Sequence, residues 1–125
     1  MGHAESILVI DDEPQIRNLL KGFLSLWGYQ VRVAPGGQEA LTLVDEETPR
    51  LILLDLYMPG MNGVEVLRKL RAKKYAGGVI FLTANLDSKL LQEARDLGPV
   101  NFMGKPMDLQ RVVLAVQVGC SLSEP

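Results

Sequence analysis

Residues able to do chemistry stand directly after short apolar runs of this sequence. They are Asp11, Asp12 and Glu13 after Ser6–Ile10, Asp55 after Leu51–Leu54, Thr83 after Val79–Leu82, and Lys105 shortly after Val100–Met103. Crowded carboxylates repel one another unless a cation neutralises them, and oxygen ligands without His or Cys favour a hard ion such as Mg²⁺. A lysine and a hydroxyl beside that ion suit the oxygens of a phosphoryl group.

One carboxylate of this set is expected to be the nucleophile. A carboxylate held beside a metal ion can attack a phosphoryl group and form an aspartyl phosphate. Asp55 follows four consecutive apolar residues and lies at the centre of the predicted constellation. The sequence therefore predicts phosphoryl transfer onto Asp55, with Lys105 neutralising charge and Thr83 donating a hydrogen bond.

The apolar runs read as strands. Ser6–Ile10, Leu51–Leu54 and Val79–Leu82 are continuously apolar, which is typical of strands covered on both faces in a parallel sheet. Val31–Val33 and Val100–Met103 carry polar residues at alternate positions, so we expect them at the edges of the sheet.

In the segments between these strands, apolar residues recur at the spacing of a helix. The first helix is predicted by apolar residues at helical spacing from Ile16, through Leu19, to Trp27, with Trp27 as its last core residue. Four further helices are predicted around Ala40–Val44, Val64–Leu70, Leu90–Leu97 and Leu109–Val116, the last one ending at Gly119.

Five strands alternating with five helices predict an α/β fold. Such alternation gives a parallel sheet with right-handed crossovers and helices on both faces. With the second and fifth strands at the edges, the strand order is 2-1-3-4-5, a doubly wound sheet whose functional site lies at the carboxyl ends of its central strands.

Composition excludes several classes of protein. The chain has 125 residues, of which 47% are hydrophobic and 22% charged, which fits one globular domain spanning residues 1–125 with a core of about 5–120. A net charge of −2 gives no basic field for nucleic acid or membrane surfaces. Because the chain shows no signal peptide and has one cysteine, we expect it in the cytoplasm.

These residues resemble the receiver domain of two-component response regulators. The resemblance rests on Asp11-Asp12, Asp55, Thr83 and Lys105-Pro106, and on the surrounding segments 7–14, 53–63 and 81–84. It implies a flavodoxin-like (βα)5 receiver fold and a phosphorelay function. The partner would be a histidine kinase or a histidine phosphotransfer protein that donates its phosphoryl group to Asp55.

The resemblance also implies a role for each site residue. Mg²⁺ would be held by Asp11, Asp12, Asp55 and the backbone carbonyl of Tyr57, and the phosphoryl group by Thr83, Ala84 and Lys105. Thr83 and Phe102 would act as the switch residues, and the Lys105-Pro106 bond would be cis. The face built from the fourth helix, the fifth strand and the fifth helix would then change, so that Leu114 and Val118 contact a second copy or an output domain.

Three positions tune or depart from the family's pattern. Phe102 stands where the family often has Tyr, so its inward state would rest on packing alone. Pro99 is expected to stiffen its turn. Tyr57 and Asn85 flank the phosphoryl group, and we expect the bulky Tyr57 to shield it from water and slow its hydrolysis.

Other functions stay open at this point. Asp11, Asp12 and Glu13 precede Pro14, so they could serve only as the cap of a helix. An aspartyl-phosphate phosphatase would need a second aspartate where Tyr57 stands, and a flavodoxin-like cofactor carrier would need a phosphate-binding loop in place of the acidic run. A receiver that signals without phosphorylation is the remaining alternative. We expect a signalling protein that catalyses its own phosphoryl transfer and slow dephosphorylation, not an enzyme.

Overall fold

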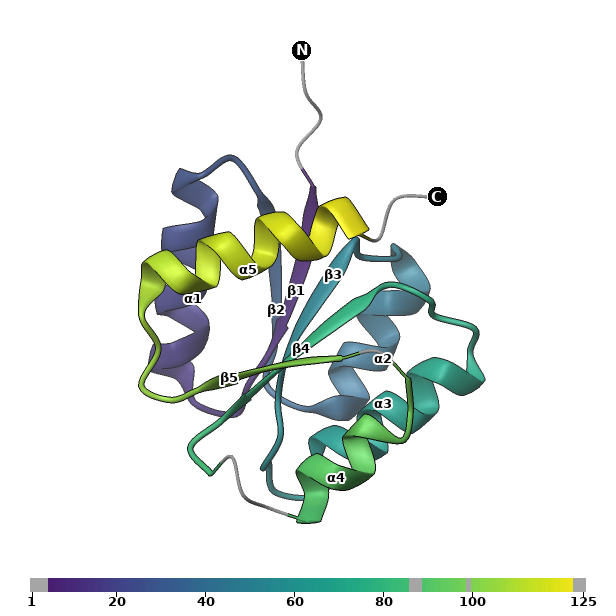
Figure 1. Cartoon of the computed structure of the whole chain (residues 1–125). Coiled ribbons are helices and arrows are strands. Elements are labelled where there is room, and N and C mark those ends of the chain that lie inside the picture. The colour runs from purple at the N-terminus through teal and green to yellow at the C-terminus, as the bar shows by residue number, and fades with distance from the viewer. Residues whose placement is uncertain (1–4, 86–88, 99, 123–125) are drawn as a thin grey trace.

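A single five-stranded parallel sheet forms the centre of the molecule (Figure 1). The computed structural model describes residues 5–85, 89–98 and 100–122. The strand order is β2-β1-β3-β4-β5, which confirms the predicted order. The strands are β1 (Ser6–Ile10), β2 (Gln30–Ala34), β3 (Leu51–Asp55), β4 (Gly78–Thr83) and β5 (Asn101–Gly104).

Five helices cover the two faces of this sheet. They are α1 (Pro14–Leu26), α2 (Gly37–Glu46), α3 (Gly63–Ala72), α4 (Lys89–Arg95) and α5 (Leu109–Leu122). Within the described parts of the chain, no helix is long and apolar enough to cross a membrane.

Alternation along the strands divides the core into two layers. In β1, Leu8 and Ile10 pack with α2, α3 and α4, whereas Ile7 and Val9 pack with α1 and α5. This follows from the strand period of two, because successive side chains point to opposite faces. The central strands are buried on both faces and the edge strands β2 and β5 are partly exposed, as predicted.

The end of α1 differs from the prediction. Trp27 is 56% exposed and Leu19 is 46% exposed, so neither is a core residue. The helix stops at Leu26, Gly28 takes a positive φ of 90°, and the chain turns away towards β2 before the indole can pack. Leu19 lies to one side of the stripe that buries Leu20 and Leu24.

The end of α5 also differs from the prediction, because the helix continues through Gly119 to Leu122. A Cβ at Gly119 would lie only 2.9 Å from Cδ1 of Leu51, at the start of β3. The glycine therefore allows α5 to pack closely on the sheet, and it does not end the helix. A glycine inside a helix costs only about 1 kcal/mol, which this close packing offsets.

The beginning of β1 and the end of α5 lie at the same end of the sheet, the end at which β1 starts (Figure 1). Arg50, just before β3, donates from Nε to the carbonyl oxygen of Cys120 at 3.1 Å and lies 3.6 Å from the carboxylate of Glu5. These contacts join residues from before β1, before β3 and late in α5. We call the end of the sheet at which β1 and β3 start the amino edge, and the opposite end, at which β3 ends in Asp55, the carboxyl edge. These names refer to the ends of the strands and not to the edge strands β2 and β5.

Gly63, the first residue of α3, packs directly on the backbone at the carboxyl edge. A Cβ at this position would stand 2.5 Å from the carbonyl oxygen of Asp55 and 2.9 Å from Cα of Leu56. The preceding Asn62 caps α3 by accepting a hydrogen bond from Glu65 N, and the Glu65 side chain accepts one from Asn62 N. The cap and the glycine together bring α3 against the end of β3.

Replacing Gly63 tests this close packing. We expect Gly63→Ala to lower the free energy of unfolding by about 2 kcal/mol, because backbone atoms must move to admit the methyl group. Gly22→Ala is the matched control, since a Cβ at Gly22 in α1 meets nothing within 4 Å and should stabilise the helix by about 0.5–1 kcal/mol. Urea unfolding followed by circular dichroism measures both, and equal stability of the two variants would contradict the prediction.

Candidate functional site

The carboxyl edge brings together side chains from four strand ends. Asp11 follows β1, Asp55 is the last residue of β3, Thr83 is the last residue of β4, and Lys105 follows β5. The register keeps these ends level, because Ile10 pairs with Leu54, Asp55 with Leu82, and Thr83 with Gly104. The peptide bond between Lys105 and Pro106 is cis.

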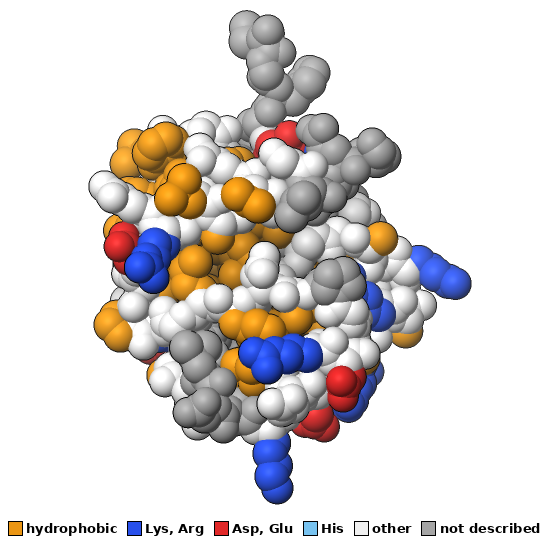
Figure 2. Space-filling view, viewed as in Figure 1, with side chains coloured by type: hydrophobic (Ala, Val, Ile, Leu, Met, Phe, Trp, Pro, Cys, Tyr) orange, Lys and Arg blue, Asp and Glu red, His pale blue; other side chains and the backbone are white. Residues whose placement is uncertain are grey.

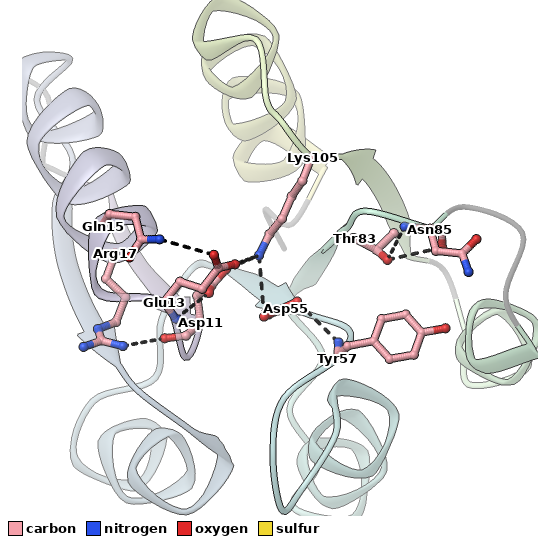
Figure 3. A network of polar contacts seen from close by, with 9 residues as sticks. All are labelled: Asp11, Glu13, Gln15, Arg17, Asp55, Tyr57, Thr83, Asn85 and Lys105. Atoms are coloured by element: carbon pink, nitrogen blue, oxygen red, sulfur yellow. Dashed lines mark hydrogen bonds and ion pairs between the residues drawn. The ribbon is translucent and has the colours of Figure 1, made fainter.

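The ammonium of Lys105 lies among three carboxylates (Figure 3). Its Nζ donates to Asp11 Oδ2 at 2.8 Å and to Glu13 Oε1 at 3.0 Å. Asp55 Oδ2 is 3.5 Å away, within ion-pair distance. The lysine side chain is only 13% exposed, so water screens these contacts weakly.

Hydrogen bonds hold both the side chain and the backbone carbonyl of Asp11. Its side chain is fully buried, and Oδ1 accepts a hydrogen bond from the backbone N–H of Glu13 at 2.9 Å. Its backbone carbonyl accepts one from Arg17 at 2.7 Å, so α1 is tied to the end of β1. This contribution of Arg17 had no signal in the sequence, because it depends on how α1 is oriented against the strand.

Four carboxylates could hold a metal ion at this edge. The carboxylate oxygens of Asp11, Asp12, Glu13 and Asp55 lie within 4.8 Å of one another. A donor set of carboxylate oxygens alone fits a hard cation such as Mg²⁺. The side chain of Glu13 makes no capping hydrogen bond to α1 although it occupies the N-cap position, so the helix-cap alternative does not account for it.

Thr83 and its neighbours lie on the other side of Asp55. The buried Thr83 hydroxyl accepts a hydrogen bond from Asn85 N at 3.1 Å and donates to the Asn85 carbonyl at 3.2 Å. The hydroxyl therefore points along its own loop and not towards the carboxylate of Asp55 (Figure 3). Ala84 and Asn85 are exposed at the same loop.

Tyr57 is joined to Asp55 through its backbone. Its N–H donates to Asp55 Oδ1 at 3.3 Å, while the residue is 45% exposed and its ring points away from that carboxylate (Figure 3). Shielding of a phosphoryl group by this ring, as the sequence predicts, would therefore need the side chain to rotate.

Pro99, which we expect from the sequence to stiffen its turn, lies outside the described residues.

Phe102 is half-buried between a ring and a cation. Its ring stacks on Phe81, with centroids 5.7 Å apart, and the guanidinium of Arg95 lies 5.2 Å from its centroid. A cation over an aromatic face is favourable, so Arg95 of α4 stabilises this ring position. The sequence analysis missed Arg95, whose role depends on the packing of α4 beside β5.

Crowding of acids alters the protonation of Asp55. Burial and the charge of Asp11 raise its pKa to about 7, against the smaller opposing effects of Lys105 and the Tyr57 N–H. For Lys105, burial acts to lower the pKa, but its hydrogen bonds to Asp11 and Glu13 outweigh this effect and hold the pKa above its usual value. The lysine is therefore charged, and without a metal ion the carboxylates around it outnumber its single positive charge.

The raised pKa of Asp55 predicts how stability depends on pH in the metal-free protein. Between the unfolded-state pKa of 3.8 and about 7, the folded protein binds more protons than the unfolded chain, so its stability falls as pH rises. Asp55→Asn removes this titration and should be more stable than wild type at pH 8, by about 2 kcal/mol. Thermal unfolding in EDTA at pH 5 and pH 8 measures the difference. Parallel pH profiles for the two proteins would contradict it.

Comparison with known protein families agrees with this arrangement. The family model "Response regulator receiver domain" matches residues 7–117. Sporulation initiation phosphotransferase F of Bacillus subtilis is 37% identical over 113 residues, which cover 90% of this chain and 91% of that protein. The transcriptional regulatory protein ResD of the same organism is 40% identical over 111 residues. These cover 89% of this chain but only 46% of ResD, so the chain spans about half the length of that relative.

Solved structures show the same fold. The chemotaxis protein CheY4 of Vibrio cholerae superimposes with a TM-score of 0.86 at 26% identity, covering 93% of this chain and 98% of that one. The receiver domain of the Francisella response regulator 1452 has a TM-score of 0.86 at 28% identity, covering 96% and 99%. With a family model matching nearly its whole length, this chain belongs to the response regulator receiver domains, the signalling modules of two-component systems.

Proposed function

We propose that this protein is a phosphoacceptor that takes a phosphoryl group onto Asp55 from a phosphohistidine. Receiver domains of response regulators interact with histidine kinases or phosphotransfer proteins, and either class could be the donor here. The observation that carries the proposal is the position of Asp55. Its carboxylate is buried at the carboxyl edge, 3.5 Å from Lys105 and within a group of carboxylates suited to a cation.

The transfer requires one bond to form and one to break. A carboxylate oxygen of Asp55 attacks phosphorus, the phosphorus–nitrogen bond to the donor imidazole breaks, and its electron pair leaves with the imidazole. Mg²⁺, when bound by Asp11, Asp12, Asp55 and the Tyr57 carbonyl, would neutralise charge on the transferring group. Lys105 would hold a phosphoryl oxygen by a charge-assisted hydrogen bond.

Two further groups would complete the contact with the phosphoryl group. Ala84 is exposed in the loop after β4, where its backbone N–H would donate to a phosphoryl oxygen, and the Thr83 hydroxyl would exchange its contact with Asn85 for another phosphoryl oxygen. That exchange would pull the loop after β4 towards Asp55. We infer that Phe102 then changes its packing and alters the face formed by α4, β5 and α5.

Intact-mass spectrometry tests the proposed function. Incubation with acetyl phosphate should add one phosphoryl group in the presence of Mg²⁺ and none without it, because the carboxylates repel an anionic donor until a cation neutralises them. Asp55→Asn, which lacks the nucleophile, should show no adduct.

Two other results would contradict the proposal in different ways. A folded, Mg²⁺-binding protein that forms no adduct would be a receiver that signals without phosphorylation. Rapid consumption of acetyl phosphate without a lasting adduct would indicate a phosphatase. The proposed phosphoacceptor is itself a cytoplasmic signalling protein whose dephosphorylation is slow.

Exposed apolar side chains mark a surface for the output of this switch. The described part of the chain exposes six large hydrophobic residues. Five of them belong to α5, to α1 or to Trp27, the C-cap of α1. Figure 2 shows hydrophobic side chains gathered over α5 and the neighbouring end of α1. On α5, Leu114 is 60% exposed and Val118 is 53% exposed, and the spacing of four residues places them on one side of the helix. We propose that they contact a second copy of the phosphorylated chain.

Sedimentation velocity tests this contact. With Mg²⁺ and beryllofluoride as a phosphoryl mimic, wild type should sediment as a dimer, and the double variant Leu114→Glu/Val118→Glu should remain monomeric because the new charges would be buried. Gln38→Glu/Thr42→Glu is the control, since both residues are exposed on α2, four positions apart, on the other face of the sheet and outside the proposed contact. A wild-type monomer both with and without the mimic would contradict the dimer.

A further inference from the structure

Glu13 has a contact that its position in the sequence does not explain. It occupies the N-cap of α1, where an acidic side chain would ordinarily accept a hydrogen bond from a backbone N–H of the first turn, yet it makes no such backbone bond. Its Oε1 instead accepts a hydrogen bond from Lys105 at 3.0 Å. The two residues are separated by 92 positions in the chain, so this contact is a product of the fold.

The three carboxylates around Lys105 are not equivalent. The ammonium has three N–H donors. Two of them make hydrogen bonds, to Asp11 and Glu13 at 2.8 and 3.0 Å, while Asp55 is at the longer distance of 3.5 Å. Lys105 is therefore held chiefly by Asp11 and Glu13, and it faces Asp55 without being bound tightly to it.

The backbone of Glu13 is fixed while its side chain is at the rim of the site. Its N–H donates to Asp11 Oδ1, and its carbonyl accepts the first hydrogen bonds of α1, from Ile16 at 3.1 Å and Arg17 at 3.2 Å. The Gln15 amide lies 3.4 Å from the second carboxylate oxygen. The Glu13 side chain is 44% exposed, whereas Asp11 is fully buried. Glu13 is thus a well-placed acceptor on the solvent side of Lys105.

We propose that Glu13 is a positioning residue that keeps the Lys105 ammonium beside Asp55 during phosphoryl transfer. This rests on the proposed function of Asp55. A cation held by Asp11, Asp12 and Asp55 would compete with the lysine for the carboxylates of Asp11 and Asp55. Glu13 is then the remaining acidic partner of Lys105. One N–H stays on Glu13, and the other two are free to bind the phosphoryl oxygens.

The rate of adduct formation tests this role. At saturating Mg²⁺, Glu13→Ala should slow phosphorylation by acetyl phosphate about fivefold, the effect expected for one partly exposed charge-assisted hydrogen bond. Glu13→Gln keeps an acceptor oxygen at the same distance and should recover part of that rate. Glu46→Gln, at an exposed position late in α2, removes one negative charge far from the site and should leave the rate unchanged.

A second measurement reports on Lys105 without phosphorylation. The ¹⁵N-labelled ammonium signal of Lys105, assigned by its loss in Lys105→Arg, should be visible in the metal-free protein because hydrogen-bonded ammonium protons exchange slowly with water. It should broaden in Glu13→Ala and stay sharp in Glu46→Gln. The Mg²⁺ affinity of Glu13→Ala, measured by amide chemical shifts, should stay within about twofold of wild type, because the ligands proposed for the ion are Asp11, Asp12, Asp55 and the Tyr57 carbonyl, which the substitution leaves in place.

Three results would overturn the inference. A Glu13→Ala rate equal to or above that of wild type would show that Glu13 does not assist transfer. A tenfold loss of Mg²⁺ affinity would make Glu13 a metal ligand. A Lys105 signal unaffected by Glu13→Ala would show that the hydrogen bond does not hold the ammonium. Failure of the wild-type chain itself to form an adduct would contradict the proposed function. The wild-type result therefore tests the proposed function, and the comparison of Glu13→Ala with wild type tests the role of Glu13.

Discussion

The ammonium of Lys105 compensates a cluster of carboxylates that would otherwise repel one another. Asp11 is completely buried and Asp55 nearly so, and buried charges are tolerated only when they are paired or bind metal ions. The pairing has a structural consequence, because the lysine follows β5 at one side of the sheet and its partners follow β1 and end β3. One side chain thus links the loops at the carboxyl edge across the width of β3 and β4.

The same crowding connects the chemistry of the site with the stability of the fold. One lysine lies among three of the four clustered carboxylates, and burial together with the charge of Asp11 raises the pKa of Asp55. Gly63 brings α3 against the backbone of that same residue, so the carboxylate has little freedom to move out of the cluster. A divalent cation would relieve the repulsion without any rearrangement of the sheet. Folding alone thus brings together the carboxylates that could hold such an ion.

Much of the arrangement could be predicted from the sequence because it depends on local patterns. Continuous apolar runs marked the central strands, and the polar residue after each run had to lie at the carboxyl edge once the strands were parallel. Side-chain contacts could not be predicted in this way. The bond between Glu13 and Lys105, the turn of the Thr83 hydroxyl towards Asn85, and the place of Arg95 over Phe102 all depend on rotamers chosen by tertiary packing. Trp27 fits the helical pattern but comes after the helix has ended, where the pattern no longer applies.

The position of the amino edge limits how a signal could leave this domain. Glu5 and Cys120 are joined through Arg50 at that edge, while Asp55 and Lys105 lie at the other end of the strands. Strands of five residues separate the two edges by about 16 Å. A module tethered at either terminus would therefore be anchored about one strand length from Asp55. The tether would raise the local concentration of the attached module, and direct contact with Asp55 would require the linker to span the length of the strands.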